Sequence, residues 1–156
     1  MIFSRENFLS KTLCDEIIDI YNVNYSKQNF EYGGTYPYWI YHDEEYKTHH
    51  DSIKSVIASV TDLCRLFDKE SKLETCQVVK WPVGASQQEH IDPPGDTYAA
   101  LVYLNDDYTG GETCFHGAKI TPEKGKLLLF SSRELYHWVN FVREAERYTL
   151  ALWFTK

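Results

Sequence analysis

The C-terminal stretch ERYTLALWF, residues 146–154, is an apolar run interrupted by Arg147 and Thr149. From Leu73 onward the chain consists of short runs of this kind, with a hydrophobic period of two and turn residues between them. This pattern is typical of antiparallel strands, and seven or eight of them favour a jelly roll or a barrel. The predicted strands are 74–81, 86–92, 98–104, 112–116, 118–121, 126–131, 134–141 and 146–154.

The first half of the chain shows apolar residues at helical spacing. Thr12 with Asp15 matches a capping box, which predicts where the first helix begins. A longer apolar stripe predicts a second helix with Asp51 or Ser52 as its N-cap. The predicted helices cover residues 12–23 and 51–68.

Length and composition indicate a single domain, and the strand and helix patterns make it mainly β with flanking helices. The chain has 156 residues, with 12 Tyr, 8 Phe and 4 Trp, which is a globular composition. We expect a single domain over 1–156, in which residues 1–72 supply helical support and an aromatic loop and residues 73–156 form the jelly-roll core. The cysteines are far apart in the sequence and are expected to be reduced core thiols: Cys14, Cys64, Cys76 and Cys114.

Charge and hydropathy exclude several classes of partner. The formal net charge is -7 and Lys and Arg are dispersed, which argues against binding to nucleic acid or an anionic membrane. The longest apolar stretch, Tyr98–Leu104, is too short for a membrane helix. Met1–Ser10 lacks the apolar core of a signal peptide, so a cytoplasmic location is expected. Oligomeric state is not predicted by these features.

Two predicted strands carry histidines that suit a metal site. His90 and Asp92 lie two residues apart in a strand and therefore share a face. His137, from a later strand, can supply a third ligand, and two His with one carboxylate are the ligand set of non-haem Fe(II) oxygenases. The H-x-D pattern alone is weak, because a surface pair beside a turn also explains it.

Arg147 is the second unusual feature of the β region. It shares a strand face with Thr149, ten residues after His137, and a guanidinium in an apolar strand is costly to bury without an anion. A carboxylate held at two oxygens suits the guanidinium fork. An internal salt bridge to Asp or Glu is the alternative.

Taken together, these residues resemble the 2-oxoglutarate- and Fe(II)-dependent dioxygenases, in particular their prolyl 4-hydroxylase-like branch. The resemblance runs from about Gln77 to Thr155, in the family's order, through WPVG (81–84), HxD (90–92), YLND (103–106), GGETxF (110–115), GKLLLF (125–130), His137 and RYTLxLW (147–153). It implies a double-stranded β-helix (a cupin-like jelly roll) with two N-terminal supporting helices.

The resemblance also implies roles for individual residues. His90, Asp92 and His137 would bind Fe(II), and Arg147 would hold the distal carboxylate of 2-oxoglutarate, with Tyr103 and Thr149 as hydrogen-bonding helpers. The reaction would use O2 and decarboxylate 2-oxoglutarate to succinate and CO2 while hydroxylating a C–H bond, with ascorbate as a reductant. Because related halogenases have Gly or Ala in place of Asp92, hydroxylation is favoured over halogenation.

The substrate is predicted less sharply. A prolyl residue in a peptide or protein is the first hypothesis, a free amino acid or other small molecule is the alternative, and a non-catalytic cupin-like metal-binding module is an alternative of another class. Many relatives have Tyr where this chain has Trp81 and Gln87, and the loop at residues 93–97 is short. The aromatic segment from Phe30 to Tyr46 can form a lid or pack as core. Candidate substrate contacts are Tyr36, Tyr38, Trp39, Trp81 and Gln87, whereas His42, His49, His50 and His116 are expected to be ordinary surface or loop residues.

Overall fold

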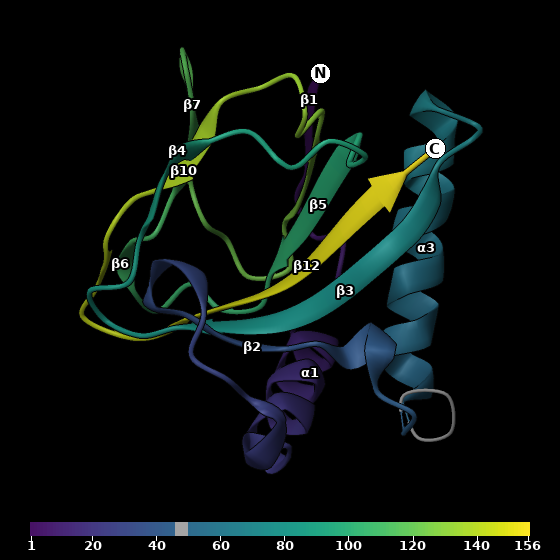
Figure 1. Ribbon diagram of the computed structural model, residues 1–156. Helices are drawn as coiled ribbons and strands as arrows, with labels where there is room; N and C mark the ends of the chain where they lie inside the picture. The colour runs from purple at the N-terminus through teal and green to yellow at the C-terminus, as the bar shows by residue number, and fades with distance from the viewer. Residues whose placement is uncertain (46–49) are drawn as a thin grey trace.

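The structure, a computed structural model, describes residues 1–45 and 50–156 and is mainly β with two long helices (Figure 1). The helices are α1 (Lys11–Val23) and α3 (Asp51–Phe67), with short 3-10 turns η1 (Tyr25–Lys27), η2 (Tyr32–Gly34) and η3 (Ile40–His42). The strands are β1 (Ile2–Arg5), β2 (Tyr36–Tyr38), β3 (Lys72–Trp81), β4 (Gln87–His90), β5 (Tyr98–Tyr103), β6 (Thr109–Gly110), β7 (Thr113–Phe115), β8 (Ala118–Ile120), β9 (Leu127–Phe130), β10 (His137–Val139), β11 (Val142–Arg143) and β12 (Arg147–Thr155).

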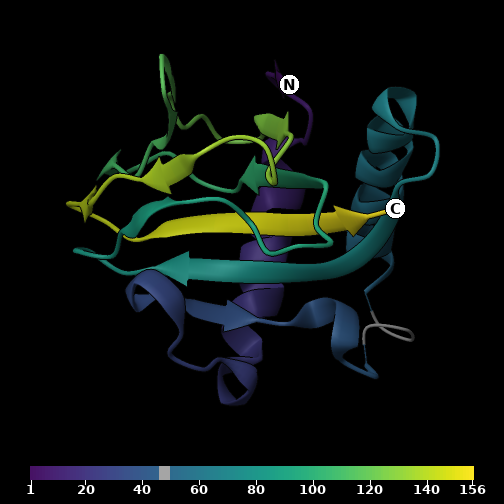
Figure 2. The same cartoon turned by 45° about the horizontal axis from the view of Figure 1, so that its top comes forward.

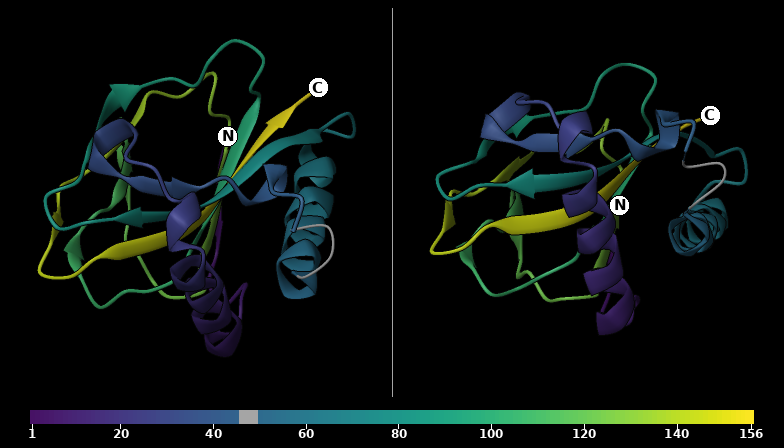
Figure 3. Two further views of the ribbon diagram at one scale, coloured as in Figure 1. Left: turned by 60° about the horizontal axis from the view of Figure 1, so that its bottom comes forward. Right: turned by 90° about the horizontal axis from the view of Figure 1, so that it is seen from below.

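The strands form a large and a small antiparallel sheet. The large sheet has the order β1-β9-β5-β12-β3-β2, the small sheet has the order β4-β10-β7-β8, and β11 pairs with β6. In Figure 2, β12 and β3 run side by side in opposite directions, with α1 behind them. Figure 3 shows α1 and α3 on the same side of the large sheet, so the opposite face of that sheet is left for the small sheet.

Strand β12 shows how the large sheet serves two purposes. Leu150, Leu152 and Phe154 are fully buried and pack into the core shared with α1 and α3. The residues between them point to the other face, because side chains alternate along a strand. Arg147, Thr149, Ala151 and Trp153 on that face line a cavity between the sheets. The core and the candidate site are therefore separated by the thickness of one sheet.

The predicted mainly β fold with two helices is confirmed, and the details differ at element ends. The N-cap of α1 is Ser10, whose hydroxyl accepts a hydrogen bond from the Leu13 amide at 3.2 Å, so the predicted capping box at Thr12 is wrong. His50, rather than Asp51 or Ser52, is the N-cap of α3.

The predicted strand over 134–141 is in fact shorter. It is β10, and the chain continues after it into the two-residue strand β11. The two-residue strands β6 and β11 were not predicted, nor were β1 and β2, because β1 is largely exposed and β2 has only three residues with a proline in the middle. Strands β1 and β2 nevertheless extend the large sheet at its edges.

The four cysteines are buried free thiols, as predicted. Among the described residues, no helix is long and apolar enough to cross a membrane.

Candidate active site

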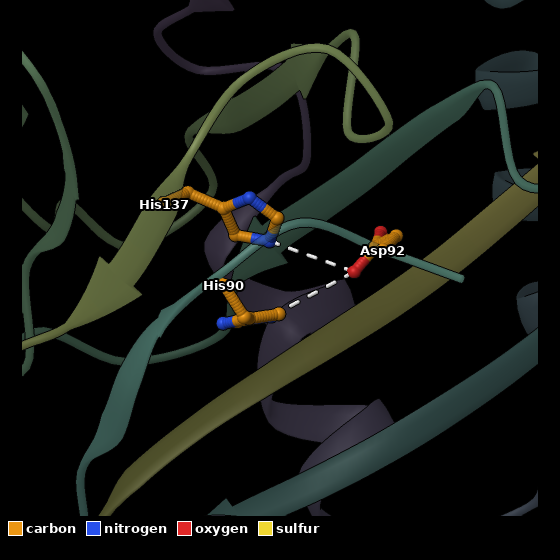
Figure 4. A group of neighbouring side chains, drawn as sticks. All are labelled: His90, Asp92 and His137. Atoms are coloured by element: carbon orange, nitrogen blue, oxygen red, sulfur yellow. Dashed lines mark ion pairs between the residues drawn. The ribbon is translucent and has the colours of Figure 1, made fainter. Parts of the chain in front are cut away.

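His90, Asp92 and His137 meet between the two sheets (Figure 4). His90 ends β4 and His137 begins β10, and these two residues are paired across the small sheet. The Nε2 atoms of His90 and His137 lie 3.7 and 3.6 Å from Oδ1 of Asp92, which follows β4. One ligand atom from each residue lies within 4.8 Å of the others, and no second group of this kind occurs in the described part of the chain.

Neighbouring groups orient all three side chains toward a common point. Nδ1 of His90 is 2.7 Å from the Gln88 carbonyl, and Nδ1 of His137 is 2.9 Å from the Leu135 carbonyl. A carbonyl oxygen can only accept, so each Nδ1 carries a proton, and in the neutral form of each ring Nε2 presents its lone pair to the common point. Burial lowers the pKa of His137, with the nearby His90 acting in the same direction, which favours the neutral imidazole that a metal requires.

The carboxylate of Asp92 is oriented in the same way. Its Oδ2 accepts a hydrogen bond from the indole Nε1 of Trp153 at 3.1 Å, whereas Oδ1 faces the two histidines. Two imidazole Nε2 atoms and one oriented carboxylate oxygen form the donor set that binds non-haem Fe(II). The residues present therefore fit such an ion.

A cavity of about 480 Å³ extends over the large sheet beside this triad. Its floor is built from alternate residues of β3 and β12, where Trp81 pairs with Arg147, Val79 with Thr149, Gln77 with Ala151 and Thr75 with Trp153. The opposite wall includes the triad histidines. Most of the walls are apolar, and Arg147 is the one Lys or Arg that lines the cavity among the residues described.

Arg147 is 1% exposed and lacks an acidic partner. Its Cζ lies 4.7 Å from the ring centroid of Trp81 and 5.4 Å from that of Tyr103, and Nη2 donates weakly to the Thr113 hydroxyl at 3.5 Å. Nε has no hydrogen-bond partner, and no described carboxylate forms an ion pair with this guanidinium. The alternative of an internal salt bridge is therefore wrong. A buried, unpaired cation facing a cavity calls for an anionic ligand.

The two residues expected to assist Arg147 differ in position. Thr149 lines the cavity on the same face as Arg147. Tyr103 pairs with Thr149 across β5 and β12 and shares that face, but it is fully buried and donates its hydroxyl proton to Thr113 at 2.9 Å. The Tyr103 ring contacts the guanidinium directly, and its hydroxyl also connects to Arg147 through Thr113, a residue that does line the cavity and that sequence reasoning missed.

Comparison with known proteins agrees with this geometry. The model of the 2OG-Fe(II) oxygenase superfamily matches residues 76–155. The chain belongs to this superfamily. The membership confirms the resemblance seen in the sequence and places the chain among 2-oxoglutarate-dependent dioxygenases, which are enzymes.

Several relatives of this oxygenase are prolyl hydroxylases. Human (Homo sapiens) prolyl 3-hydroxylase 2 is 41% identical over 75 residues, and the match covers 41% of this chain but only 11% of the relative's length. The fold resembles a Pseudomonas putida prolyl-4-hydroxylase with a TM-score of 0.81 at 20% identity, covering 99% of this chain and 92% of the other. A Trichoplax adhaerens prolyl hydroxylase, solved with a peptide fragment of the hypoxia inducible factor oxygen degradation domain, gives 0.77 at 24% identity and coverages of 99% and 83%.

The candidate substrate contacts of the oxygenase divide into two groups. Trp39, Trp81 and Gln87 line the cavity. Tyr36 and Tyr38 do not, because the Tyr36 ring packs between Phe30 and Lys80, and Tyr38 belongs to the core and donates its hydroxyl proton to Asp43 at 2.5 Å. The assignment of Tyr38 as a substrate contact is therefore replaced by a structural role.

Tyr32 is a cavity residue that was not predicted. Its hydroxyl donates to Oε1 of Gln77 at 2.9 Å, and its ring meets that of Trp81 edge-on at 6.1 Å. The next residue, Gly33, has φ +61° and approaches Ser86 so closely that a Cβ would lie 2.2 Å from the Ser86 carbonyl oxygen. Only glycine fits there, and this close approach holds Tyr32 in the cavity wall.

The remaining members of the aromatic segment and the other histidines are less informative. Tyr46 and His49 lie outside the described residues. His42 and His116 are exposed, as expected, but His50 is buried. The segment thus contributes two rings, Tyr32 and Trp39, to the cavity, while Tyr38 and Tyr41 pack with the core.

Proposed function

We propose that this oxygenase hydroxylates a prolyl residue of a peptide or protein, using Fe(II), O2 and 2-oxoglutarate. The observation that carries the proposal is the pairing, within one cavity, of a His-Asp-His triad with a buried guanidinium that has no acidic partner. The triad supplies donor atoms for a metal, and the buried guanidinium requires a carboxylate ligand.

In this proposal the triad holds the iron. His90 and His137 donate through Nε2 and Asp92 through Oδ1, while the Trp153 indole keeps Oδ2 engaged. A facial set of three protein ligands leaves the remaining coordination positions open for cosubstrates. Bound Fe(II) with 2-oxoglutarate and O2 supplies the oxidation that inserts an oxygen atom into a C–H bond and releases succinate and CO2, with ascorbate as the expected reductant.

The other residues bind and orient the cosubstrate. Arg147 binds the distal carboxylate of 2-oxoglutarate with its planar fork, and Thr149 donates from the same strand face. Tyr103 packs its ring beside the guanidinium and holds Thr113 with its hydroxyl. Val79, Ala151 and other apolar side chains of the wall keep water from the site, which strengthens these charged hydrogen bonds.

A prolyl substrate is supported by the relatives, which are named as prolyl hydroxylases. It is also supported by the aromatic rings of Tyr32, Trp39 and Trp153, since flat apolar rings pack well against a pyrrolidine ring. A free amino acid or other small molecule remains the second substrate class. The short loop at residues 93–97 is compatible with either class, because it allows an open groove for a peptide or a small substrate held by other residues.

Turnover of 2-oxoglutarate tests the proposal directly. Purified protein with Fe(II) should form succinate when given proline-containing peptides, and mass spectrometry should find peptides that have gained one oxygen atom. Asp92→Ala and Arg147→Ala should each abolish succinate formation, while Arg143→Ala, an exposed arginine on β11, should leave it unchanged. Succinate formation that survives both cavity changes would rule out the assigned roles. If free amino acids gain an oxygen atom and no peptide does, the substrate is a small molecule and not a peptide or protein.

A further inference from the structure

The cavity has a second end with its own chemistry. Arg147 and Trp153 lie on one face of β12, six residues apart, which corresponds to about 20 Å along a strand. Trp153 pairs with Thr75 of β3, and the Thr75 hydroxyl lies 3.0 Å from Nε2 of His42, whose ring neighbours that of Trp39. We call this end the mouth and define it by Trp39, Glu74, Asp96 and Trp153, all of which line the cavity.

The two carboxylates of the mouth are unpaired. The side chains of Glu74 and Asp96 make no ion pair or hydrogen bond with any described residue, and the guanidinium of Arg147 belongs to the opposite end of the cavity. Partial burial raises the pKa of Asp96, and the negative charges of Asp92 and Glu74 raise it further. The mouth therefore carries an uncompensated negative potential that a ligand cation would relieve.

Hydrogen bonds hold the two indoles of the mouth in place, and both rings line the cavity. Nε1 of Trp39 donates to Oε1 of Glu31 at 2.8 Å, and Nε1 of Trp153 donates to Asp92. Trp39 is 37% exposed, so part of its ring is open to a ligand. Indole faces beside carboxylates attract ammonium and guanidinium groups, because the ring quadrupole and the charges act in the same direction.

We propose that the mouth binds the side chain of a lysine or arginine that flanks the hydroxylated residue of a peptide substrate. This inference rests on the proposed function and narrows its substrate to peptides with a cation near the target. Because Trp153 contacts the metal ligand Asp92, the cation binds close to the reacting residue, within a few positions of an extended chain.

Matched peptides test the preference. Fluorescein-labelled peptides carry one proline and either lysine, norleucine or glutamate at each flanking position in turn, so that charge varies while length is kept. Binding is measured by fluorescence anisotropy and turnover by succinate formation. At one flanking position or more, the lysine peptide should bind about fivefold more tightly than the norleucine peptide, and this ratio should shrink at high salt. Equal binding of the lysine and norleucine peptides at all positions would overturn the inference.

Two double variants assign the preference to the mouth. Glu74→Gln with Asp96→Asn should reduce the lysine-to-norleucine ratio to near one, with the KM for 2-oxoglutarate unchanged. Glu16→Gln with Asp19→Asn removes the same charge from the exposed side of α1 and should keep the ratio. A preference that persists in the first variant, or that both variants lose equally, would contradict a specific mouth. Absence of peptide turnover with an intact binding preference would count against the proposed reaction only.

Discussion

The indole Nε1 of Trp153 donates a hydrogen bond to Oδ2 of Asp92 at 3.1 Å, on the side of the carboxylate away from the two histidines. Trp153 lies on β12, the strand that also carries Arg147 and Thr149. One strand thus orients a candidate metal ligand and supplies the candidate anchor of the cosubstrate. The two halves of the site are therefore set in fixed relation by the backbone of β12.

We expect Trp153→Phe to weaken metal binding by about 10- to 100-fold, because Asp92 loses the donor that orients it. Titration with Co(II) under anaerobic conditions, followed by absorption, measures the affinity without turnover. Trp138→Phe is the matched control, since the Trp138 indole donates to Asn140 and packs beside His116, with no described hydrogen bond or ring contact to a triad side chain. Equal metal affinity in wild type and Trp153→Phe would show that the hydrogen bond has no role in metal binding.

Arg147→Lys should raise the KM for 2-oxoglutarate by at least about tenfold, since lysine keeps the charge but lacks the planar fork. Cation–π contacts with Trp81 and Tyr103 also favour the guanidinium at this position. Steady-state succinate formation at varied 2-oxoglutarate gives the KM. Arg143→Lys, on the exposed strand β11, should behave as wild type. An unchanged KM in Arg147→Lys would mean that charge alone binds the carboxylate.

Tyr38→Phe should lower the free energy of unfolding by about 1–2 kcal/mol, because a buried hydroxyl loses its bond to the Asp43 carboxylate. The KM for peptide should not change, since Tyr38 packs in the core. Urea unfolding and peptide kinetics measure the two effects. Tyr36→Phe, two residues earlier on β2, should leave stability near wild type. An increased KM for peptide with normal stability in Tyr38→Phe would show that Tyr38 contacts the substrate, as the sequence suggests.

The lowered pKa of Asp43 should make the free energy of unfolding depend on pH in the acid range. Partial burial acts to raise the pKa of Asp43, but hydrogen bonds from Lys27 and Tyr38 outweigh this and lower the pKa to about 2. Between about pH 4, the ordinary pKa of an aspartate, and about pH 2, the unfolded chain binds more protons than the folded chain. The free energy of unfolding therefore falls as the pH decreases through that window. Urea unfolding of wild type and Asp43→Asn should give curves that converge toward pH 2. A stability difference that is constant from pH 5 to about pH 2 would refute the assigned pKa.

The candidate metal ligands and Arg147 could be recognised in the sequence because their signals are local. His90 and Asp92 are two residues apart at the end of one strand, and Arg147 and Thr149 repeat that spacing on another. Strand periodicity alone brings such pairs to one face. His137 required only the assumption that a later strand lies beside β4, which the pairing of the two histidines bears out.

The residues that escaped prediction depend on contacts distant in sequence. Tyr32 enters the cavity because Gly33 packs against Ser86, and nothing near Tyr32 in the chain indicates that contact. The direction of Tyr38 is set by the pairing of β2 with β3, and a three-residue strand with a central proline shows too little alternation to reveal it. Glu74 and Asp96 become neighbours only when β3 and the loop before β5 meet at the mouth.

The alternation of β12 has a consequence for how this chain can change in evolution. Leu150, Leu152 and Phe154 face the helices, and Arg147, Thr149 and Trp153 face the cavity. Deleting or inserting one residue within this strand would exchange the two sets, placing leucines in the cavity and a guanidinium in the core. Substitutions on the cavity side can accumulate singly, but changes in length cannot. Indels should therefore be tolerated in the flanking turns and be excluded from β12 itself.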